Sequence, residues 1–463
     1  MQEEIWQAGA VELARLIARR KVSPVEVVEA TLARIQQLNP RLNAFLSLST
    51  GALDEARAAE RRVARGGRAP LLGVPVAIKD LILTKDAPTT AGSRVFGDGM
   101  TSDHDAPVVA ALRRAGAIIV GRTNLHEIAL GVTSENEHFD PVHNPWDLTR
   151  VPGGSSGGSG AAVAAGLVPV ALGTDTRGSI RIPAAACGIT GLKPTSGRIS
   201  TEGVIPLSWT LDSVGPMTRS AEDAALVFGV IAGRSGRTRW PGRAGGIRGL
   251  KIGVCEFLMR DLDPEIARAV ESAIAVFRRA NAWVTEVKIP ELEGNPDAAG
   301  LITLAEAIAF YHPHIEAHPE TVGRSTGLGP KVLERLKRAY QISARDLVLA
   351  HRQRLATITA LERTFESVSV LVGATIPAFP SVIGSGEVQI GGRTEPVLRE
   401  FPRLTSLANF AGLPALSVPC GFGRAGLPMG LQLVGPENGD EALLAMGSFF
   451  QRETDWHRRW PPE

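Results

Sequence analysis

Short apolar runs alternate with segments of helical periodicity along most of this chain. Val74–Ile78 is an apolar run that follows Gly73, and Ala117–Val120 is the next such run. Between them, Asp105–Ala115 has the apolar spacing of a helix, which Gly116 would end. Strands that alternate with helices in this way are typical of a fold in which helices flank a sheet. The sequence therefore predicts an α/β protein.

The same rhythm indicates how the chain is organised. Residues 1–65 have a helical pattern, and residues 66–233 combine apolar runs with segments rich in glycine and serine. A basic stretch with glycine and proline, 234–249, is expected to be a surface excursion. Strand and helix patterns then resume over 250–463, which should complete the sheet and supply substrate-pocket helices. We therefore predict a single domain over 1–463.

Composition and charge exclude several classes of protein. The chain has 463 residues, with 50 Lys and Arg against 48 Asp and Glu, so its formal charge is +2. This balance gives no electrostatic reason to expect nucleic acid or an anionic membrane as a partner. No apolar stretch reaches the roughly 18 residues of a membrane span, and the acidic start is unlike a signal peptide. The three cysteines form no CxxC pair, which favours a reducing, cytoplasmic setting.

A segment rich in glycine and serine, 153–161, is the first candidate for chemistry. One interpretation is a plain glycine-rich loop, and the lysine of a phosphate-binding P-loop is missing. The segment also fits G-x-S-x-G, the nucleophile elbow of α/β-hydrolase esterases, with Ser156 as the nucleophile. That motif should follow a strand, whereas Trp146–Pro152 lacks a strand pattern.

Ser179 lies where a strand pattern gives way to a helical one. It follows the apolar run Val168–Leu172 and precedes an alanine-rich segment. At such a turn, several backbone N–H groups can point toward the serine hydroxyl and bind the oxyanion of a tetrahedral intermediate. The segment would then supply both a nucleophile and an oxyanion hole. The simpler interpretation is a serine that caps the following helix.

Lys79 ends the apolar run that begins at Val74. A lysine in this place is expected to be drawn into the interior, where burial disfavours the ammonium ion and lowers its pKa. A neutral lysine can act as a base at neutral pH. The competing interpretation is a lysine that reaches the surface or pairs with Asp80.

Together these segments resemble the amidase signature family, and the resemblance extends over nearly the whole chain. It implies the family's fold, a large mixed β-sheet core covered by helices on both faces. It also implies a hydrolase that cleaves a carbon–nitrogen amide-type bond. The matching segments are the Lys79 strand, the Gly/Ser run 153–166, 173–198, Thr123–Glu127, Asn144–Asp147 and Leu413–Pro419.

The resemblance places the family's catalytic triad on Lys79, Ser155 and Ser179. It implies that Lys79 takes a proton from Ser155, which takes one from Ser179, and that Ser179 forms an acyl-enzyme. It also implies a cis peptide bond between Gly154 and Ser155. Neither a cofactor nor a metal is implied. The expected oxyanion hole consists of the backbone N–H groups of Thr176, Arg177, Gly178 and Ser179.

Three further residues are expected to support the triad, namely Ser156, Asp175 and Arg181. Asp175 should orient the nucleophile loop by accepting backbone hydrogen bonds. A nearby departure from the family is Arg177, which stands where the family usually has glycine. Either this position has a positive φ, which would cost arginine roughly 1 kcal/mol relative to glycine, or its side chain lines the substrate pocket. We hypothesise that Arg177 shapes substrate choice.

The resemblance also bears on the substrate and the partners. The glutaminase subunit of the tRNA-dependent amidotransferase has an aspartate shortly before a threonine of its C-terminal stretch. Here Pro402 takes that place, ahead of Thr405 and Asn409. This favours a stand-alone amidase over the glutaminase subunit of the amidotransferase. The expected substrate is a small aryl or alkyl amide or a carbamate. A homodimer is a possible oligomeric state that the sequence does not decide.

Overall fold

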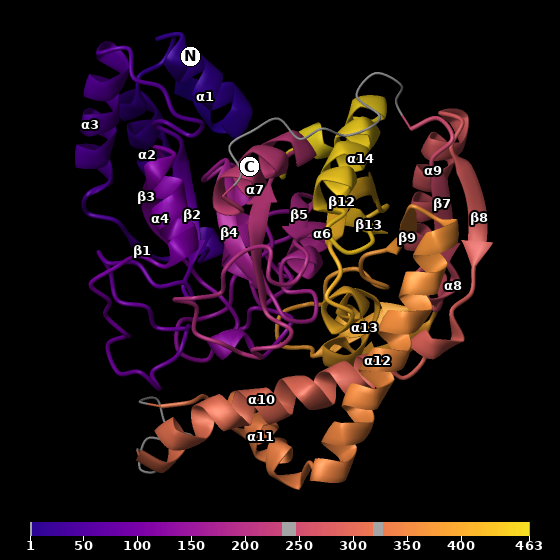
Figure 1. Cartoon of the computed structure of the whole chain (residues 1–463). Coiled ribbons are helices and arrows are strands. Elements are labelled where there is room, and N and C mark those ends of the chain that lie inside the picture. Colours follow the sequence, from indigo (N-terminus) through magenta and orange to yellow (C-terminus); the bar gives the residue numbers. More distant parts are fainter. Residues whose placement is uncertain (1, 234–246, 318–326, 463) are drawn as a thin grey trace.

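The computed structural model describes residues 2–233, 247–317 and 327–462, and most of the predicted surface excursion at 234–249 lies outside these described residues (Figure 1). One mixed sheet of eleven strands runs through the described part of the chain. In spatial order its strands are β1 (Phe45–Leu48), β3 (Ile118–Thr123), β2 (Pro75–Lys79), β4 (Val170–Asp175), β6 (Ser213–Thr218), β5 (Thr190–Lys193), β12 (Ala415–Phe422), β13 (Pro428–Val434), β9 (Val370–Ala374), β7 (Lys251–Cys255) and β8 (Trp283–Val287). A separate hairpin pairs β10 (Glu387–Ile390) with β11 (Arg393–Pro396).

Helices make up most of the remaining described residues. The α-helices are α1 (Ala10–Ala18), α2 (Pro24–Leu42), α3 (Ala52–Ala64), α4 (Pro107–Arg114), α5 (Gly157–Ala164), α6 (Arg181–Cys187), α7 (Ala221–Ile231), α8 (Glu256–Met259), α9 (Pro264–Arg279), α10 (Asn295–Ala317), α11 (Pro330–Arg338), α12 (Ala344–Ser367), α13 (Val397–Phe410) and α14 (Asp440–Glu453). Short 3₁₀ helices are η1 (Gln2–Gln7), η2 (Glu127–Ala129), η3 (Pro290–Leu292), η4 (Ala339–Gln341) and η5 (Trp456–Arg458).

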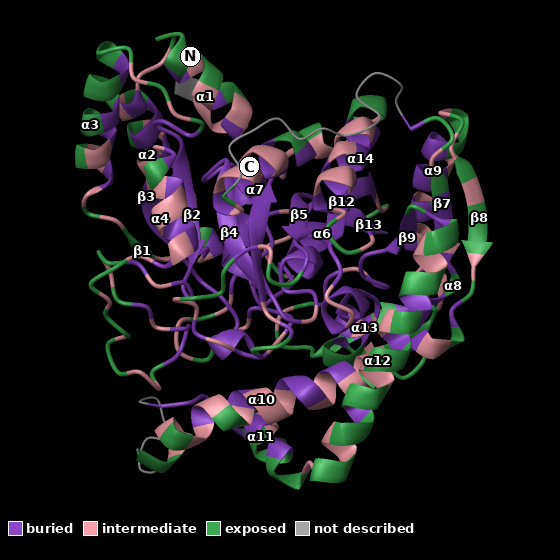
Figure 2. Ribbon diagram, viewed as in Figure 1, coloured by how far each residue is buried: buried purple, intermediate pink, exposed green. Residues whose placement is uncertain are grey.

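The sheet is mixed, as the resemblance implied. Strand β2 pairs in parallel with both β3 and β4, and β7 pairs in parallel with both β8 and β9. The central strands between these two groups are antiparallel to their neighbours. The central strands are buried while β8 at the edge is largely exposed (Figure 2).

Helices cover both faces of the sheet, which confirms the second part of the predicted architecture. Successive strand residues point to opposite faces. On β13, an added Cβ at Gly430 would meet Ala185 of α6, whereas Met429 faces Gly421, which packs near Ala269 of α9. Helices α5 and α6 contact the sheet and each other, and α7, α9 and α14 cover the other side.

Strand β6 shows where the sequence pattern is insufficient. It contains Gly215 and Pro216, both unfavourable in strands, so local propensity does not predict a strand there. A Cβ at Gly215 would lie 2.0 Å from the carbonyl oxygen of Leu192. The close approach of β5 and β6 therefore requires glycine, so tertiary packing overrides local propensity.

Helices α10, α11 and α12 form a separate group at one end of the sheet (Figure 1). Helix α10 packs against both α12 and α13. Its Gly300 and Thr303, together with Arg335 of α11, line a cavity that also contains Ser179. Helices α10 and α11 therefore form one wall of the candidate site.

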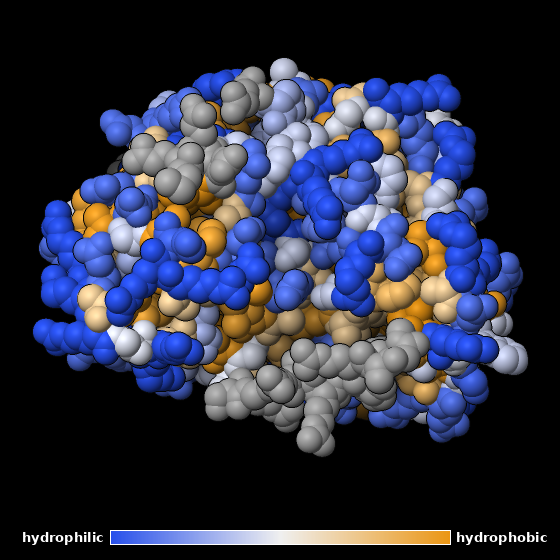
Figure 3. Space-filling view, turned by 90° about the horizontal axis from the view of Figure 1, so that it is seen from above, coloured by the Kyte–Doolittle hydropathy of each residue, from blue (hydrophilic) through white to orange (hydrophobic). Residues whose placement is uncertain are grey.

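The helices differ from those that cross membranes. Within the described ranges, no helix has the length and apolar character needed to cross a bilayer. On the face shown in Figure 3, polar side chains divide the apolar ones into separate patches.

Candidate active site

Lys79 occupies the last position of β2, where the strand meets the loops that carry Ser155 and Ser179. Strands β2 and β4 run in parallel with Ile78 opposite Leu172, so both end at the same edge of the sheet. Lys79 is completely buried. Its Nζ makes two hydrogen bonds of 2.8 Å, to Ser155 Oγ and to Thr174 Oγ1.

Burial sets the protonation of Lys79. Loss of solvation lowers the pKa of Lys79 to about 7, although the carboxylates of Asp212 and Asp175 act to raise it. Asp80 does not neutralise the lysine, because its carboxylate pairs with Arg122 and accepts from Thr90. The competing interpretation of a Lys79–Asp80 pair is therefore wrong. Near pH 7 a large fraction of Lys79 is uncharged and able to accept a proton.

The two serines of the predicted triad come from different loops. Ser155 follows the cis peptide bond from Gly154 and lies just before α5, fully buried. Ser179 lies between β4 and α6 and faces a cavity. The Ser156 N–H donates to the Ser179 carbonyl at 3.2 Å, which holds the two loops together.

Only one of the two hydrogen bonds expected within the predicted triad is present among the described residues. The hydroxyl of Ser155 is hydrogen bonded to Lys79, whereas no hydrogen bond between Ser155 Oγ and Ser179 Oγ is present in the described residues. Catalytic hydrogen bonds are often long in a substrate-free enzyme and shorten when substrate binds. The structure thus joins two of the three predicted residues directly and brings the third close through backbone contacts.

The loop 175–179 was predicted to supply four oxyanion-binding amides. The Gly178 N–H instead donates to Asp175 Oδ1 at 2.7 Å. Because this amide already has an acceptor, it is not available as one of the predicted oxyanion-binding amides. The amides of Thr176, Arg177 and Ser179 have no intramolecular acceptor in the described part of the chain. Three amides, rather than four, are therefore available to an oxyanion.

The backbone of this loop also settles one alternative for Arg177. The positive φ falls on Gly178, at +128°, and not on Arg177. A Cβ at Gly178 would lie 2.1 Å from Thr405 Oγ1, which in turn donates to the Arg177 carbonyl at 2.6 Å. Glycine is therefore needed at 178, and the suggestion that Arg177 bears backbone strain is wrong.

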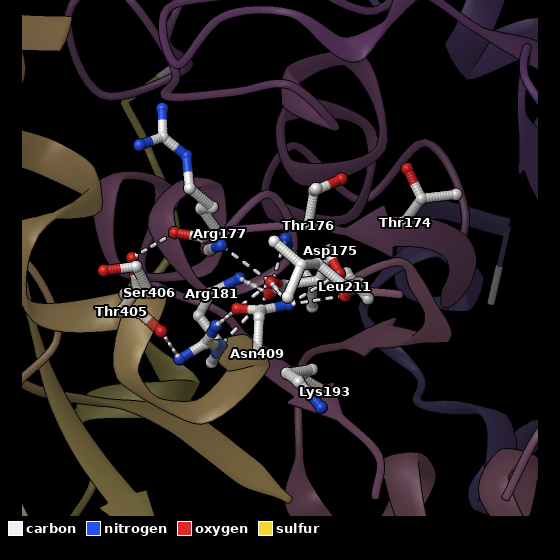
Figure 4. A network of polar contacts seen from close by, with 12 residues as sticks. Thr174, Asp175, Thr176, Arg177, Arg181, Lys193, Leu211, Thr405, Ser406 and Asn409 are labelled. Atoms are coloured by element: carbon white, nitrogen blue, oxygen red, sulfur yellow. Dashed lines mark hydrogen bonds and ion pairs between the residues drawn. The ribbon is translucent and has the colours of Figure 1, made fainter. Parts of the chain in front are cut away.

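A buried ion pair fixes the shape of this loop. Asp175 accepts from Arg181 Nε and Nη2, both at 3.0 Å, and from Asn409 Nδ2 at 2.9 Å (Figure 4). It also accepts from the backbone N–H groups of Gly178 and Ile180. The Arg181 charge holds the pKa of Asp175 at about 2, although burial acts to raise it. Asp175 is therefore an anion that anchors the loop.

Ser156 contributes a further internal bridge. Its hydroxyl donates to the Thr174 carbonyl at 3.1 Å and accepts from the Thr174 N–H at 3.3 Å. Its side chain is fully buried. Ser156 therefore ties the Gly/Ser segment to the end of β4.

Comparison with known proteins identifies the family. A family model described as Amidase matches residues 26–444. The chain belongs to the amidase signature family. It is an enzyme that hydrolyses carbon–nitrogen amide bonds.

The similarity to individual proteins extends over the full length. The chain is 40% identical to a glutamyl-tRNA(Gln) amidotransferase subunit from Roseiflexus castenholzii (strain DSM 13941 / HLO8), over 99% of this chain and 98% of that protein. A crystal structure of an amidase superposes with a TM-score of 0.89 at 34% identity, covering 96% of this chain and 100% of the other. A bacterial aryl acylamidase gives 0.87 at 28% identity, covering 97% of both chains.

The amidase has a cavity of about 250 Å³ beside Ser179. It is lined by Thr176, Arg177 and Ser179, by residues of α10 and α11, by the segment Ala129–Val132, and by Leu207 and Leu398. This volume suits a small molecule rather than a polymer. A cavity of about 330 Å³ elsewhere, lined by Trp6 and Trp460, contains no residue of the triad.

Two residues at the site were not predicted as functional. The Thr174 hydroxyl accepts a hydrogen bond from Lys79 Nζ. Thr174 lies near the end of β4, the strand beside β2, and this position could have indicated that it lies close to Lys79. Asp212 accepts from Thr176 Oγ1 at 2.5 Å, and burial raises its pKa to about 6. Asp212 comes from a loop 36 residues after Thr176, so no local pattern linked it to the site.

In the described ranges, no group of three or more His, Cys, Asp or Glu side chains could hold a metal ion.

The Thr174 hydroxyl is expected to hold the Lys79 amine in position for Ser155. Thr174→Val removes this hydrogen bond with little change in volume, and we expect kcat/KM on a simple amide to fall about tenfold. Thr174→Ser retains a hydroxyl and is the matched control, with near-normal activity. Equal activity of the valine and serine variants, both folded by circular dichroism, would show that the contact has no role in catalysis.

Proposed function

We propose that this enzyme hydrolyses small-molecule amides through an acyl-enzyme on Ser179, with Ser155 and Lys79 as the proton relay. The observation that carries the proposal is the buried Lys79 amine, with a pKa of about 7, hydrogen bonded to Ser155 at 2.8 Å. It lies at the sheet edge where Ser179 opens onto the cavity.

The reaction follows from these groups. Neutral Lys79 accepts the proton of Ser155 as Ser155 accepts that of Ser179, whose Oγ attacks the carbonyl carbon. The oxyanion forms near the free amides of the 175–179 loop. The proton then returns through the same relay to the leaving nitrogen, because an amine leaves poorly as an anion. Water attacks the acyl-enzyme by the same route and releases the acid.

The esterase alternative, with Ser156 as nucleophile, has less support. The Ser156 hydroxyl is fully buried and engaged with both backbone groups of Thr174. Attack on a substrate would require both of those hydrogen bonds to break. Ser179 in contrast lines the cavity.

A fluorophosphonate probe distinguishes the two serines. We expect one covalent adduct, mapped by peptide mass spectrometry to Ser179, because this hydroxyl faces the cavity and is activated by the relay. Ser179→Ala should abolish both the adduct and amide hydrolysis, while Ser156→Ala serves as the comparison. An adduct on Ser156, or labelling that persists in Ser179→Ala, would contradict the proposal.

A second candidate is a glutaminase subunit of a tRNA-dependent amidotransferase. It is favoured by the 40% identity to the amidotransferase subunit from Roseiflexus castenholzii. Against it, Pro402 lies buried in α13 where the glutaminase subunit is expected to carry an aspartate for the glutamine amino group. We therefore propose a stand-alone amidase, acting on an aryl or alkyl amide or a carbamate. A cytoplasmic location is supported by three unpaired cysteines.

Substrate profiling separates these two candidates. We expect the purified chain alone to release ammonia from small amides, with kcat/KM for glutamine at least about tenfold lower, because no carboxylate at residue 402 binds its ammonium group. Pro402→Asp tests that reason and should raise glutamine turnover relative to other amides. Glutamine as the best substrate of the unmodified chain would favour the glutaminase instead.

A further inference from the structure

The guanidinium of Arg177 has no partner in the described part of the protein. Its backbone belongs to the nucleophile loop, but its side chain extends away from the Asp175–Arg181 network, and no hydrogen bond or ion pair reaches the guanidinium (Figure 4). The side chain lines the cavity that contains Ser179. An arginine has five N–H donors, so an unpaired guanidinium in a partly buried position is available for a ligand.

The cavity as a whole carries positive charge. Arg335 and Arg338 of α11 also line it, and among the described residues its lining contains no aspartate or glutamate. Arg338 is neutralised by Glu334, at 2.7 Å, and Arg335 donates to the carbonyl of Leu130. Arg177 therefore has the least satisfied charge of the three.

The electrostatics of Arg177 support this description. Burial, and then the charge of Arg335, lower the pKa of Arg177 to about 10, and the carboxylate of Asp297 acts in the opposite direction. The side chain is still a cation at neutral pH. No ion pair joins Arg177 to Asp297 within the described residues. The guanidinium can therefore still form an ion pair with a bound anion.

Helix α10 leaves room for this guanidinium. Gly300 lies opposite Arg177, and a Cβ added there would be 2.9 Å from Arg177 Nη1. Glycine inside a helix is unfavourable relative to alanine. The helix therefore has a residue of poor propensity at the point where the guanidinium approaches it.

We propose that Arg177 is a specificity-determining residue that binds the carboxylate of a small, negatively charged amide substrate. Guanidinium and carboxylate form two parallel hydrogen bonds, a geometry that a neutral substrate cannot reproduce. Arg177 and Ser179 line the same cavity of about 250 Å³, which suits a short chain between the carboxylate and the scissile amide. This inference rests on the proposed role of Ser179 in the same cavity.

A matched pair of substrates tests the inference. Ammonia release is measured for succinamate and for its neutral methyl ester, and the ratio of the two kcat/KM values is the readout. We expect the wild-type enzyme to prefer succinamate and Arg177→Gln to lower this ratio about 30-fold or more. Arg363→Gln, which removes an exposed charge on α12 outside the cavity, is the matched control and should retain the wild-type ratio.

Gly300→Ala provides a second test that keeps the arginine. Alanine favours the helix, so the variant should fold, but its methyl group displaces the guanidinium. We expect the preference for succinamate to fall here too. A wild-type enzyme that favours the neutral ester, or an Arg177→Gln ratio equal to that of wild type, would overturn the inference.

Binding to the inactive Ser179→Ala protein separates the inference from the proposed function. Calorimetry should show succinamate binding at least about tenfold tighter than its methyl ester, and Arg177→Gln in the same background should remove the difference. The measurement reports binding rather than turnover, so failure of the carboxylate site is distinct from failure of the Ser179 mechanism, which would appear as hydrolysis by the Ser179→Ala protein. Equal binding of the acid and the ester would reject the carboxylate site whatever the outcome of the labelling experiment.

Discussion

The rest of the site depends on one buried amine that forms no ion pair with a carboxylate among the described residues. Lys79 ends a strand inside the sheet, and its Nζ is held by the two hydroxyls of Ser155 and Thr174. A paired lysine would stay charged at neutral pH, whereas burial without a direct ion pair lowers the pKa of Lys79 to about 7. The surrounding fold maintains this condition, because Arg122 pairs with the carboxylate of Asp80, the residue that follows Lys79 in the chain.

Charge around the nucleophile loop is divided between two arginines with opposite roles. Arg181 is fully buried and forms an ion pair with Asp175, and this pair stabilises the conformation of the loop. Breaking such a pair would leave an uncompensated buried charge, which is strongly destabilising. Arg177, four residues earlier, is free of ion pairs in the described structure and faces the cavity. One arginine thus holds the loop whose amides we propose bind the oxyanion, and the other lines the cavity where we propose that substrate binds.

The sequence predicted those parts of the fold and site that depend on local patterns. The predicted helix over Asp105–Ala115 corresponds to α4, and the apolar runs Val74–Ile78 and Ala117–Val120 correspond to β2 and β3. The run Val168–Leu172 predicted β4, although the strand itself spans Val170–Asp175. Lys79 could be found because it ends an apolar run, and the serines because glycine surrounds them. The sequence did not predict strand β6 or the position of Asp212 at the site, because both depend on contacts between segments that are distant in sequence. The use of the Gly178 amide by Asp175 is likewise visible only in three dimensions.

The pH dependence of kcat/KM on a neutral amide tests the role of Lys79 most directly. Because the neutral amine is the base, kcat/KM should fall about tenfold per pH unit below an inflection near 7 and level off above it. Asp212, whose pKa burial raises to about 6, acts to raise that of Lys79, so Asp212→Asn should move the inflection to lower pH. A profile that is flat from pH 5 to 8, or that rises only near the ordinary lysine pKa of about 10.4, would contradict the account.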